Sequence, residues 1–137
     1  MSMNMTAEKN APAFDTSVTI AGVTLKNPVM TASGTFGSGR EFSEFVDLNR
    51  LGAVVVKGVA DKPWNGNPAP RIAEVYGGML NSVGLQNPGV DYFIENDIPF
   101  LRQFDTKIIV NVCGHAIDEY VNVVTKLQGQ DVDLLEL

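Results

Sequence analysis

The sequence is poor in the residues that form disulfides and bind metals. It contains one cysteine, Cys113, and one histidine, His115, among 137 residues. A single cysteine cannot form an internal disulfide, which favours a reducing, cytoplasmic compartment. No cysteine or carboxylate stands at a ligand spacing from His115, so we expect no metal site and a solvated histidine at a helix start. Cys113 is expected to be a small buried hydrophobic residue.

Basic residues and long apolar runs are also scarce. Lys and Arg number 10 against 16 Asp and Glu, which gives a net charge of −6. Nucleic acids and anionic membrane surfaces attract basic faces, so we expect neither as a partner. No apolar run approaches the roughly 20 residues of a membrane-spanning helix, and the N-terminus lacks a signal-peptide core. Residues 1–16 are mostly polar and are expected to be a flexible N-terminus.

The apolar patterns that are present predict an α/β fold. Residues 18–25 alternate apolar and polar side chains around Ala21-Gly22, which is typical of a β-hairpin. The runs at 53–58 and 107–112 are rich in β-branched residues without polar alternation, as in a parallel sheet covered by helices. Two shorter segments are expected to add strands to the same sheet: PVMTASG and VDLLEL.

Segments with helical spacing separate these strands. We expect one helix over 40–52, a helix over 87–104 that Pro99 kinks or divides, and a well-defined amphipathic helix over 115–130. The order is hairpin, β-α-β, a long insertion, then α-β-α-β, which predicts parallel strands with right-handed crossovers. Such a fold is a small open sheet or half of a (β/α)₈ barrel. No G-x-G-x-x-G pattern follows a strand, so a Rossmann nucleotide site is not expected.

Candidate functional residues stand where the expected strands end, since parallel α/β folds carry their sites at that edge. Lys57 follows a buried strand, where its charge can stabilise an anion or bind a carboxylate. The alternative is a lysine that extends to solvent. Asn111 interrupts a β-branched strand and costs about 1–3 kcal/mol if unpaired. A ligand, the backbone of a neighbouring strand or a buried water would satisfy it.

Two loops complete the set of candidates. Residues 31–37, TASGTFG, are mostly small, which would let the backbone come close to a flat ligand. A tight strand-to-helix turn without a ligand would have the same sequence pattern. Residues 77–89, GGMLNSVGLQNPG, bend repeatedly yet keep Met79, Leu80 and Leu85. We interpret this stretch as a loop over the strand ends that is pinned by its apolar residues and faces a ligand. A packed loop without a ligand is the alternative.

Five motifs together resemble the class 1 dihydroorotate dehydrogenases: NPVMTASGTFG, VVVKG, GNPAPRI, GMLNSVGLQNPG and IIVNVCG. The GNPAPRI and GLQNPG versions look most like the NAD-linked 1B catalytic subunit. The resemblance runs from about Val18 to Leu137. It implies the N-terminal half of a (β/α)₈ TIM barrel preceded by a β-hairpin, with about four strands in residues 17–137.

The resemblance also implies an FMN cofactor and its contacts. Lys57 would lie near both the flavin and the substrate carboxylate, where its charge stabilises the anionic reduced flavin. The implied FMN contacts are Ala32, Ser33, Lys57, Gly58 and Asn111. The substrate-binding segment N-S-x-G-L corresponds to Asn81, Ser82, Val83, Gly84 and Leu85, with Lys57 as a further substrate contact.

The implied reaction is the oxidation of (S)-dihydroorotate to orotate in the synthesis of UMP. A base removes the proton at C5 while a hydride passes from C6 to the flavin. The family's base is a cysteine in an N-x-S-C-P-N loop after the fourth strand, a motif absent from residues 1–137, so we expect this segment alone to be inactive. Cys113 follows the third strand and is not that residue.

The resemblance further implies a homodimer and an electron-transfer subunit that carries FAD and a 2Fe–2S cluster and passes electrons to NAD. Two other interpretations stay open. One is a related flavin barrel that acts on a reduced pyrimidine, of the dihydropyrimidine dehydrogenase type. The other is a non-catalytic half-barrel module.

Overall fold

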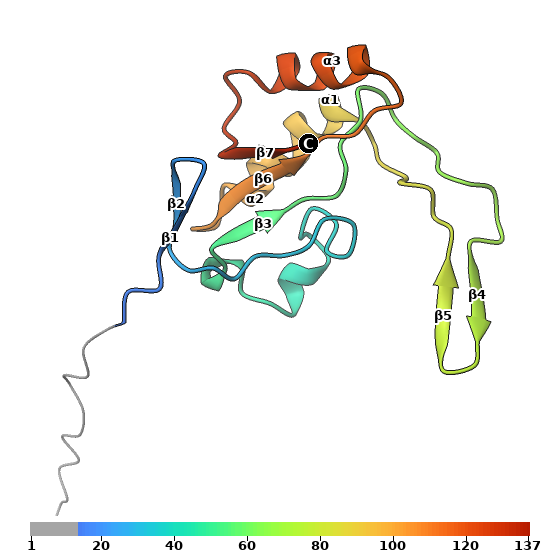
Figure 1. Ribbon diagram of the computed structural model, residues 1–137, viewed down its shortest axis with the longest axis horizontal. Coiled ribbons are helices and arrows are strands. Elements are labelled where there is room, and N and C mark those ends of the chain that lie inside the picture. Colours follow the sequence, from blue (N-terminus) through green and yellow to red (C-terminus); the bar gives the residue numbers. More distant parts are fainter. Residues whose placement is uncertain (1–13) are drawn as a thin grey trace, which may run out of the picture.

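The computed structural model describes residues 14–137, and Figure 1 shows three parts: a small hairpin, a sheet covered by helices, and a projecting arm, residues 62–89. The flexible N-terminus expected over residues 1–16 lies mostly outside the described residues. Within the described part, the amino-terminal hairpin consists of β1 (Val18–Ile20) and β2 (Val23–Leu25), which pair antiparallel across Ala21 and Gly22. Both turn residues have positive φ, as a tight hairpin turn requires.

The centre of the molecule is a parallel sheet in the order β3–β6–β7 (Figure 1). Its strands are β3 (Ala53–Val55), β6 (Lys107–Asn111) and β7 (Leu134–Glu136). Met30 adds an isolated parallel bridge to Ala53, so successive chain segments lie side by side across the sheet. The parallel α/β class predicted from the β-branched runs is confirmed.

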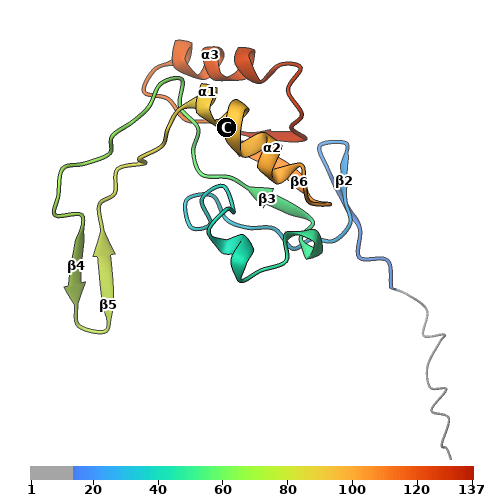
Figure 2. The same ribbon diagram turned by 180° about the vertical axis from the view of Figure 1, so that it is seen from behind.

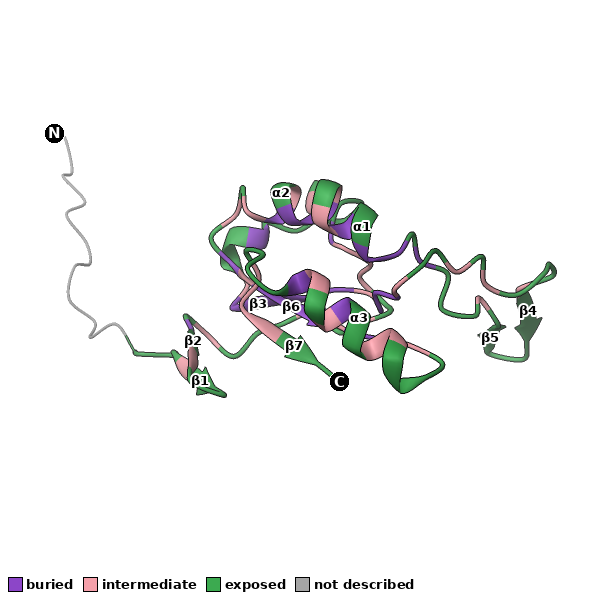
Figure 3. Cartoon of the chain, turned by 90° about the horizontal axis from the view of Figure 1, so that it is seen from above, coloured by how far each residue is buried: buried purple, intermediate pink, exposed green. Residues whose placement is uncertain are grey.

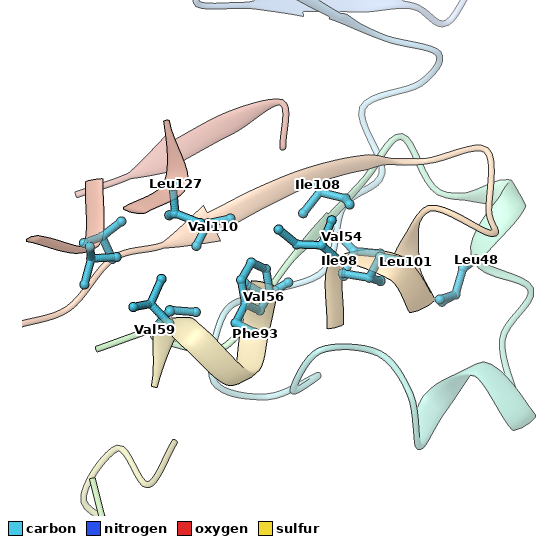
Figure 4. Packing of buried hydrophobic residues seen from close by; sticks show 13 residues of the cluster. Leu48, Val54, Val56, Val59, Phe93, Ile98, Leu101, Ile108, Val110 and Leu127 are labelled. Atoms are coloured by element: carbon cyan, nitrogen blue, oxygen red, sulfur yellow. The ribbon is translucent and has the colours of Figure 1, made fainter. Parts of the chain in front are cut away.

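One face of the sheet packs against the helices (Figure 4). Because side chains alternate along a strand, Val54 and Val56 of one segment join Ile108, Val110 and Val112 of the next on this face. The helices that cover them are α1 (Val90–Tyr92), the π-helix η3 (Phe93–Asp97), α2 (Ile98–Leu101) and α3 (Ile117–Leu127). Phe93, Leu101 and Val123 are at most 1% exposed, and burying such a side chain contributes about 1.5–3 kcal/mol.

The opposite face of the sheet carries a smaller apolar cluster. Ala53, Val55 and Ile109 pack there against Leu25 of β2, which is fully buried. The amino-terminal hairpin therefore covers the beginning of this face. At the carboxyl ends of the strands on the same face, Lys57 and Asn111 are half-buried and Glu136 is exposed.

Two of the three predicted helical segments agree with the structure. The amphipathic helix α3 confirms the prediction over 115–130. The predicted division near Pro99 is also confirmed, since α1 and α2 are short pieces joined by the π-helix η3 (Figure 2). Pro99 lacks an N–H, and the wider turn that precedes it accommodates this loss.

The single helix predicted over 40–52 is wrong. The segment forms two 3₁₀ turns, η1 (Phe42–Glu44) and η2 (Leu48–Arg50). The Asp47 side chain accepts from the backbone N–H of Asn49, which starts a new turn and interrupts a continuous helix. Of the apolar residues that suggested one helical face, Leu48 is buried but Phe45 is 83% exposed.

The interpretation of residues 77–89 as an apolar loop pinned over the strand ends is wrong for its first part. Strands β4 (Ile72–Val75) and β5 (Gly78–Asn81) form an antiparallel hairpin that projects away from the sheet (Figures 1 and 2). Figure 3 shows both strands exposed, and Met79 and Leu80 are more than 60% exposed. Tyr76 and Gly77 form the turn of this hairpin, so its two strands pair with each other.

Candidate functional site

A pocket of about 240 Å³ opens beside the carboxyl end of β3. Three chain segments form it: the turn that follows β3, the loop before η1, and the start of the helix α1–η3. It is lined by Gly37, Ser38, Arg40, Glu41, Lys57, Gly58, Val59, Asn87, Pro88, Gly89, Tyr92, Phe93 and Asp97. Lys57 and Gly58 are the predicted site residues that line it.

Lys57 lies immediately after the buried residue Val56, as predicted, and is half-buried. Its backbone N–H donates to the carbonyl of Gly37 at 3.1 Å. This bond joins the loop after Met30 to the end of β3, and it brings a cationic side chain to the open edge of the sheet.

Gly58 is the point where two other segments of the chain approach the end of β3. A Cβ at this position would lie 2.7 Å from Leu85 Cδ2 and 3.1 Å from both Asn111 Oδ1 and Cys113 Sγ. The 2.7 Å approach is closer than real Cβ atoms come to their neighbours, and the two at 3.1 Å are tight, so any larger residue requires Leu85 to move and its neighbours to adjust. Lys57, Gly58, Leu85 and Asn111 are thereby brought together from the arm and two strands.

Asn111 has a side-chain partner on the neighbouring strand. Its Nδ2 donates to Glu136 Oε2 at 2.8 Å, and Asn111 and Glu136 are paired in register between β6 and β7. Sequence reasoning considered the backbone of a neighbouring strand, water or a ligand and missed Glu136. The available signal was the spacing of Leu134 and Glu136, which puts both side chains on one face of the last strand.

Ala32 and Ser33 lie in a turn after Met30 and are outside the pocket lining. The backbone N–H of Thr35 donates to the carbonyl of Ala32, and Thr31 Oγ1 exchanges hydrogen bonds with the backbone of Val55. The segment after Met30 thus forms a hydrogen-bonded turn, and no helix begins between Met30 and Phe42. Ala32 is exposed and Ser33 half-buried.

Of the segment Asn81 to Leu85, Leu85 is the residue in contact range of Gly58. Asn81 ends β5, and Ser82 accepts from Asn67 Nδ2 at 2.9 Å on the other side of the arm. A Cβ on Gly84 would lie 2.8 Å from the Asn67 backbone nitrogen, which explains the glycine. Leu85 adopts a positive φ of 51°, a conformation that is unfavourable for a branched side chain.

Arg71 holds the two sides of the arm together. Its guanidinium donates to the carbonyls of Asn67 and Asn65 at 2.6 and 2.9 Å and to Gln86 Oε1 at 2.6 Å. Arg71 and Asn67 belong to the GNPAPRI motif, whereas Gln86 belongs to GLQNPG. The two motifs therefore interact directly in the fold.

Asn87 is a buried residue that sequence reasoning missed. Its Oδ1 accepts from the backbone N–H groups of Ala60 and Gly89 at 3.1 Å, and its Nδ2 donates to the carbonyl of Leu85 at 2.9 Å. Asn87 also exchanges two backbone hydrogen bonds with Trp64. An Asn that precedes Pro-Gly predicts a turn, but this local pattern does not identify the distant hydrogen-bond partners of Asn87.

The Trp64 ring stacks on His115 with centroids 4.2 Å apart. His115 is exposed and lies two residues before α3, close to the solvated helix-start position expected for it. The stacking was not foreseen. Together with Asn87, it attaches the base of the arm to the body.

Asp97 is a second buried polar residue at the pocket. Burial raises the pKa of its carboxyl, while the hydrogen bond from Ser38 Oγ at 2.7 Å and the nearby Arg40 act in the opposite direction. Arg40 also donates to the carbonyl of Asn96 and lies over the ring of Phe100. These contacts fix the loop before η1 against the helix.

Cys113 is buried, which confirms the expectation of a small hydrophobic role. Burial raises the pKa of its thiol, Glu119 raises it further, and Lys57 opposes both effects. A thiol of this kind is a poor base at neutral pH. Among residues 14–137, no group of three or more His, Cys, Asp or Glu side chains is arranged to hold a metal. No helix in that range is long and apolar enough to cross a membrane.

Comparison with solved structures shows the fold. A crystal structure of DHODH in complex with ferulenol from Eimeria tenella superimposes with a TM-score of 0.64 at 22% sequence identity. The match covers 88% of this chain and 35% of that one.

Comparison with curated sequences gives much closer relatives. The dihydroorotate dehydrogenase B (NAD(+)) catalytic subunit of Alkaliphilus metalliredigens is 78% identical over 120 residues, which are 88% of this chain and 40% of that protein. The subunit of the same name from Lachnoclostridium phytofermentans is 72% identical over 124 residues. The chain thus spans about 40% of the length of these relatives. The dihydroorotate dehydrogenase family model matches residues 16–137, and the chain belongs to the dihydroorotate dehydrogenase family.

Proposed function

We propose that this chain is the amino-terminal part of the FMN-binding catalytic subunit of an NAD-linked dihydroorotate dehydrogenase, acting in UMP synthesis. The observation that carries the proposal is the convergence of Lys57, Leu85 and Asn111 around Gly58 at the open edge of a parallel sheet. Identities of 72–78% to two catalytic subunits of that name support it.

The residues present suit a flat, partly anionic cofactor. Gly58 lets the Leu85 and Asn111 side chains come close to the end of β3, and Lys57 supplies a positive charge beside them. FMN is proposed to be held here by Ala32, Ser33, Lys57, Gly58 and Asn111. When bound, FMN accepts the hydride that leaves C6 of dihydroorotate.

The chain's own contribution is orientation and charge. Lys57 is proposed to bind the substrate carboxylate and to stabilise negative charge that develops during the reaction. The segment Asn81–Leu85 is proposed to contact the substrate ring, with Leu85 closest to the Lys57 group. The proton at C5 requires a base, and the raised pKa of the buried Cys113 thiol argues against that residue.

The architecture and assembly are part of the same proposal. The parallel series Met30, β3, β6 and β7 supports the first half of a (β/α)₈ barrel preceded by the β1–β2 hairpin. The words "catalytic subunit" in the relatives' names support a separate electron-transfer subunit, proposed to carry FAD and a 2Fe–2S cluster. A homodimer of catalytic subunits in the cytoplasm completes the proposal, and the free thiol of Cys113 is compatible with a reducing compartment.

The test uses a chimaeric subunit in which residues 17–137 replace the matching segment of the Alkaliphilus metalliredigens protein. We expect it to purify with FMN and to lose its yellow colour anaerobically when dihydroorotate is added. The K57M variant should reduce its flavin about 100-fold more slowly, the scale of losing one transition-state charge contact.

The two rivals give different results in the same assay. Reduction by dihydrouracil but not by dihydroorotate would favour a dihydropyrimidine dehydrogenase type. A folded chimaeric subunit that binds no flavin, next to an active parent, would favour a non-catalytic module.

A further inference from the structure

A row of polar side chains continues the sheet face opposite the helices, beyond the apolar cluster that includes Leu25, Ala53, Val55 and Ile109. Val55, Ile109 and Leu134 lie in that cluster, on three successive parallel segments. Because side chains alternate along extended backbone, the residues two positions later return to the same face. These residues are Lys57, Asn111 and Glu136. Lys57 and Asn111 belong to the proposed FMN site, and Glu136 has no assigned role.

Glu136 is the hydrogen-bond partner of the Asn111 side chain. The two residues are direct register partners, and Asn111 Nδ2 donates to Glu136 Oε2 at 2.8 Å. An ionised carboxylate only accepts hydrogen bonds, so it selects the NH₂ group of the amide. The amide oxygen is left on the side of Gly58, 3.1 Å from where a Cβ would stand.

We propose that Glu136 is a positioning residue that holds the Asn111 carboxamide with its oxygen toward the ligand, where it accepts a hydrogen bond from a flavin N–H or ribityl hydroxyl. This inference rests on the proposed function. It adds a residue that acts through Asn111 and need not touch the cofactor. Without Glu136, the amide can turn and present its NH₂ group to the same donor, which loses the bond.

The experiment measures FMN and orotate dissociation constants for the chimaeric subunit and its E136A, N111A and E136A/N111A variants. We expect E136A to weaken FMN binding about three- to tenfold, the range expected for one hydrogen bond. N111A should weaken it at least as much. The double variant should bind FMN no more weakly than N111A, because Glu136 acts through Asn111.

Two matched variants separate positioning from general stability. E136Q keeps an acceptor oxygen at the same chain length, so its FMN affinity should lie closer to the wild type than that of E136A. D131N removes an exposed carboxylate that precedes the same strand and should leave FMN affinity unchanged. If E136A does not fold, the cycle is run with E136V, which also lacks an acceptor but has a β-branched side chain suited to a strand, and the same loss of effect in the N111A background is expected.

Several results would overturn the inference. Additive losses in the double variant would mean that Glu136 acts independently of Asn111. An E136A variant with wild-type FMN affinity, or one that loses affinity for orotate alone, would remove the flavin as the oriented ligand. A wild-type chimaeric subunit that binds no FMN would overturn the proposed function itself, which distinguishes the two failures.

Discussion

At the scale of single residues, the candidate site depends on one missing side chain. Gly58 allows Leu85 of the arm, together with Asn111 and Cys113 from the end of β6, to approach the end of β3. The backbone conformation of Gly58 does not require glycine, because its φ is outside the left-handed region. The lack of room for a side chain is therefore the reason for glycine at this position.

Substitution of Gly58 by alanine tests this reading. The added Cβ would displace Leu85 and Asn111, so we expect G58A to lose about 1–3 kcal/mol of stability and to weaken FMN binding. Gly78 is the matched control, since the nearest atom to its Cβ would be 3.8 Å away. G78A should change stability by less than about 0.5 kcal/mol. Thermal unfolding and FMN titration of the chimaeric subunit give both values, and equal effects of the two variants would contradict the reading.

The charge of Asp133 contributes to stability. Burial alone would raise the pKa of its carboxyl, but hydrogen bonds from the Ile108 N–H, Lys107 and Arg102 together lower it below 3.8. A lowered pKa in the folded state stabilises the protein at pH values above 3.8, and this contribution is lost on acidification below that value.

The D133N variant should therefore be less stable than the wild type at neutral pH, by about 1.5–3 kcal/mol for the lost charged hydrogen bonds. The difference should shrink as the pH falls below 3.8. Urea unfolding of the chimaeric subunit across this range measures it. D131N, whose side chain is 72% exposed, is the control and should track the wild type. A difference that stays constant in acid would refute the assignment.

At the scale of elements, the arm is attached to the body at its base and exposed at its tip. Asn87 and Trp64 join its two sides, and Arg71 ties them again further out. Lys126 of α3 connects with Asp61 and Asp91 in an ion-pair cluster below this base. The arm can thus hold Leu85 near Gly58 even though β4 and β5 extend into solvent.

Replacement of Asn87 by alanine should release the base of the arm. Three hydrogen bonds of a buried side chain would be lost, and the backbone groups of Ala60 and Gly89 would be left without their partner. We expect faster amide hydrogen exchange over residues 62–89, with exchange in β6 and α3 unchanged. The control N65A keeps the Arg71 contact, which uses the backbone carbonyl of Asn65. Uniformly faster exchange would indicate global destabilisation and contradict a local role.

How far the sequence predicts this structure differs between elements. Val54 to Val56 and Ile108 to Val110 revealed buried parallel strands because their character is local. The prediction failed at Met79 and Leu80, because these apolar side chains were expected to pin a loop. They instead belong to a hairpin that is exposed on both faces. The partners of Asn87 and Glu136 lie up to 27 residues away, and no local pattern identifies such pairs.

At the scale of the whole molecule, the described residues leave apolar surface and strand edges uncovered. β7 pairs with β6 on one side only within residues 14–137. Beside it, Ile117 and Leu137 are each 84% exposed and Val121 is 56% exposed. Open edges and apolar patches of this kind favour association.

We therefore expect the 137-residue chain by itself to self-associate, whereas the chimaeric subunit behaves as a discrete species. Sedimentation velocity of both proteins at matched concentrations compares them directly. A monomeric 137-residue chain with a cooperative thermal melt would contradict this expectation.

The stacked pair at the base of the arm has a practical consequence. Trp64 is the single tryptophan of the chain, and its ring lies against His115. Its intrinsic fluorescence therefore comes from one known position, between the arm and the start of α3. Any movement of the arm that separates the two rings changes the polarity around the indole. The 137 residues thus carry a built-in optical probe for arm motion, and rapid-mixing emission measurements could follow that motion without an attached dye.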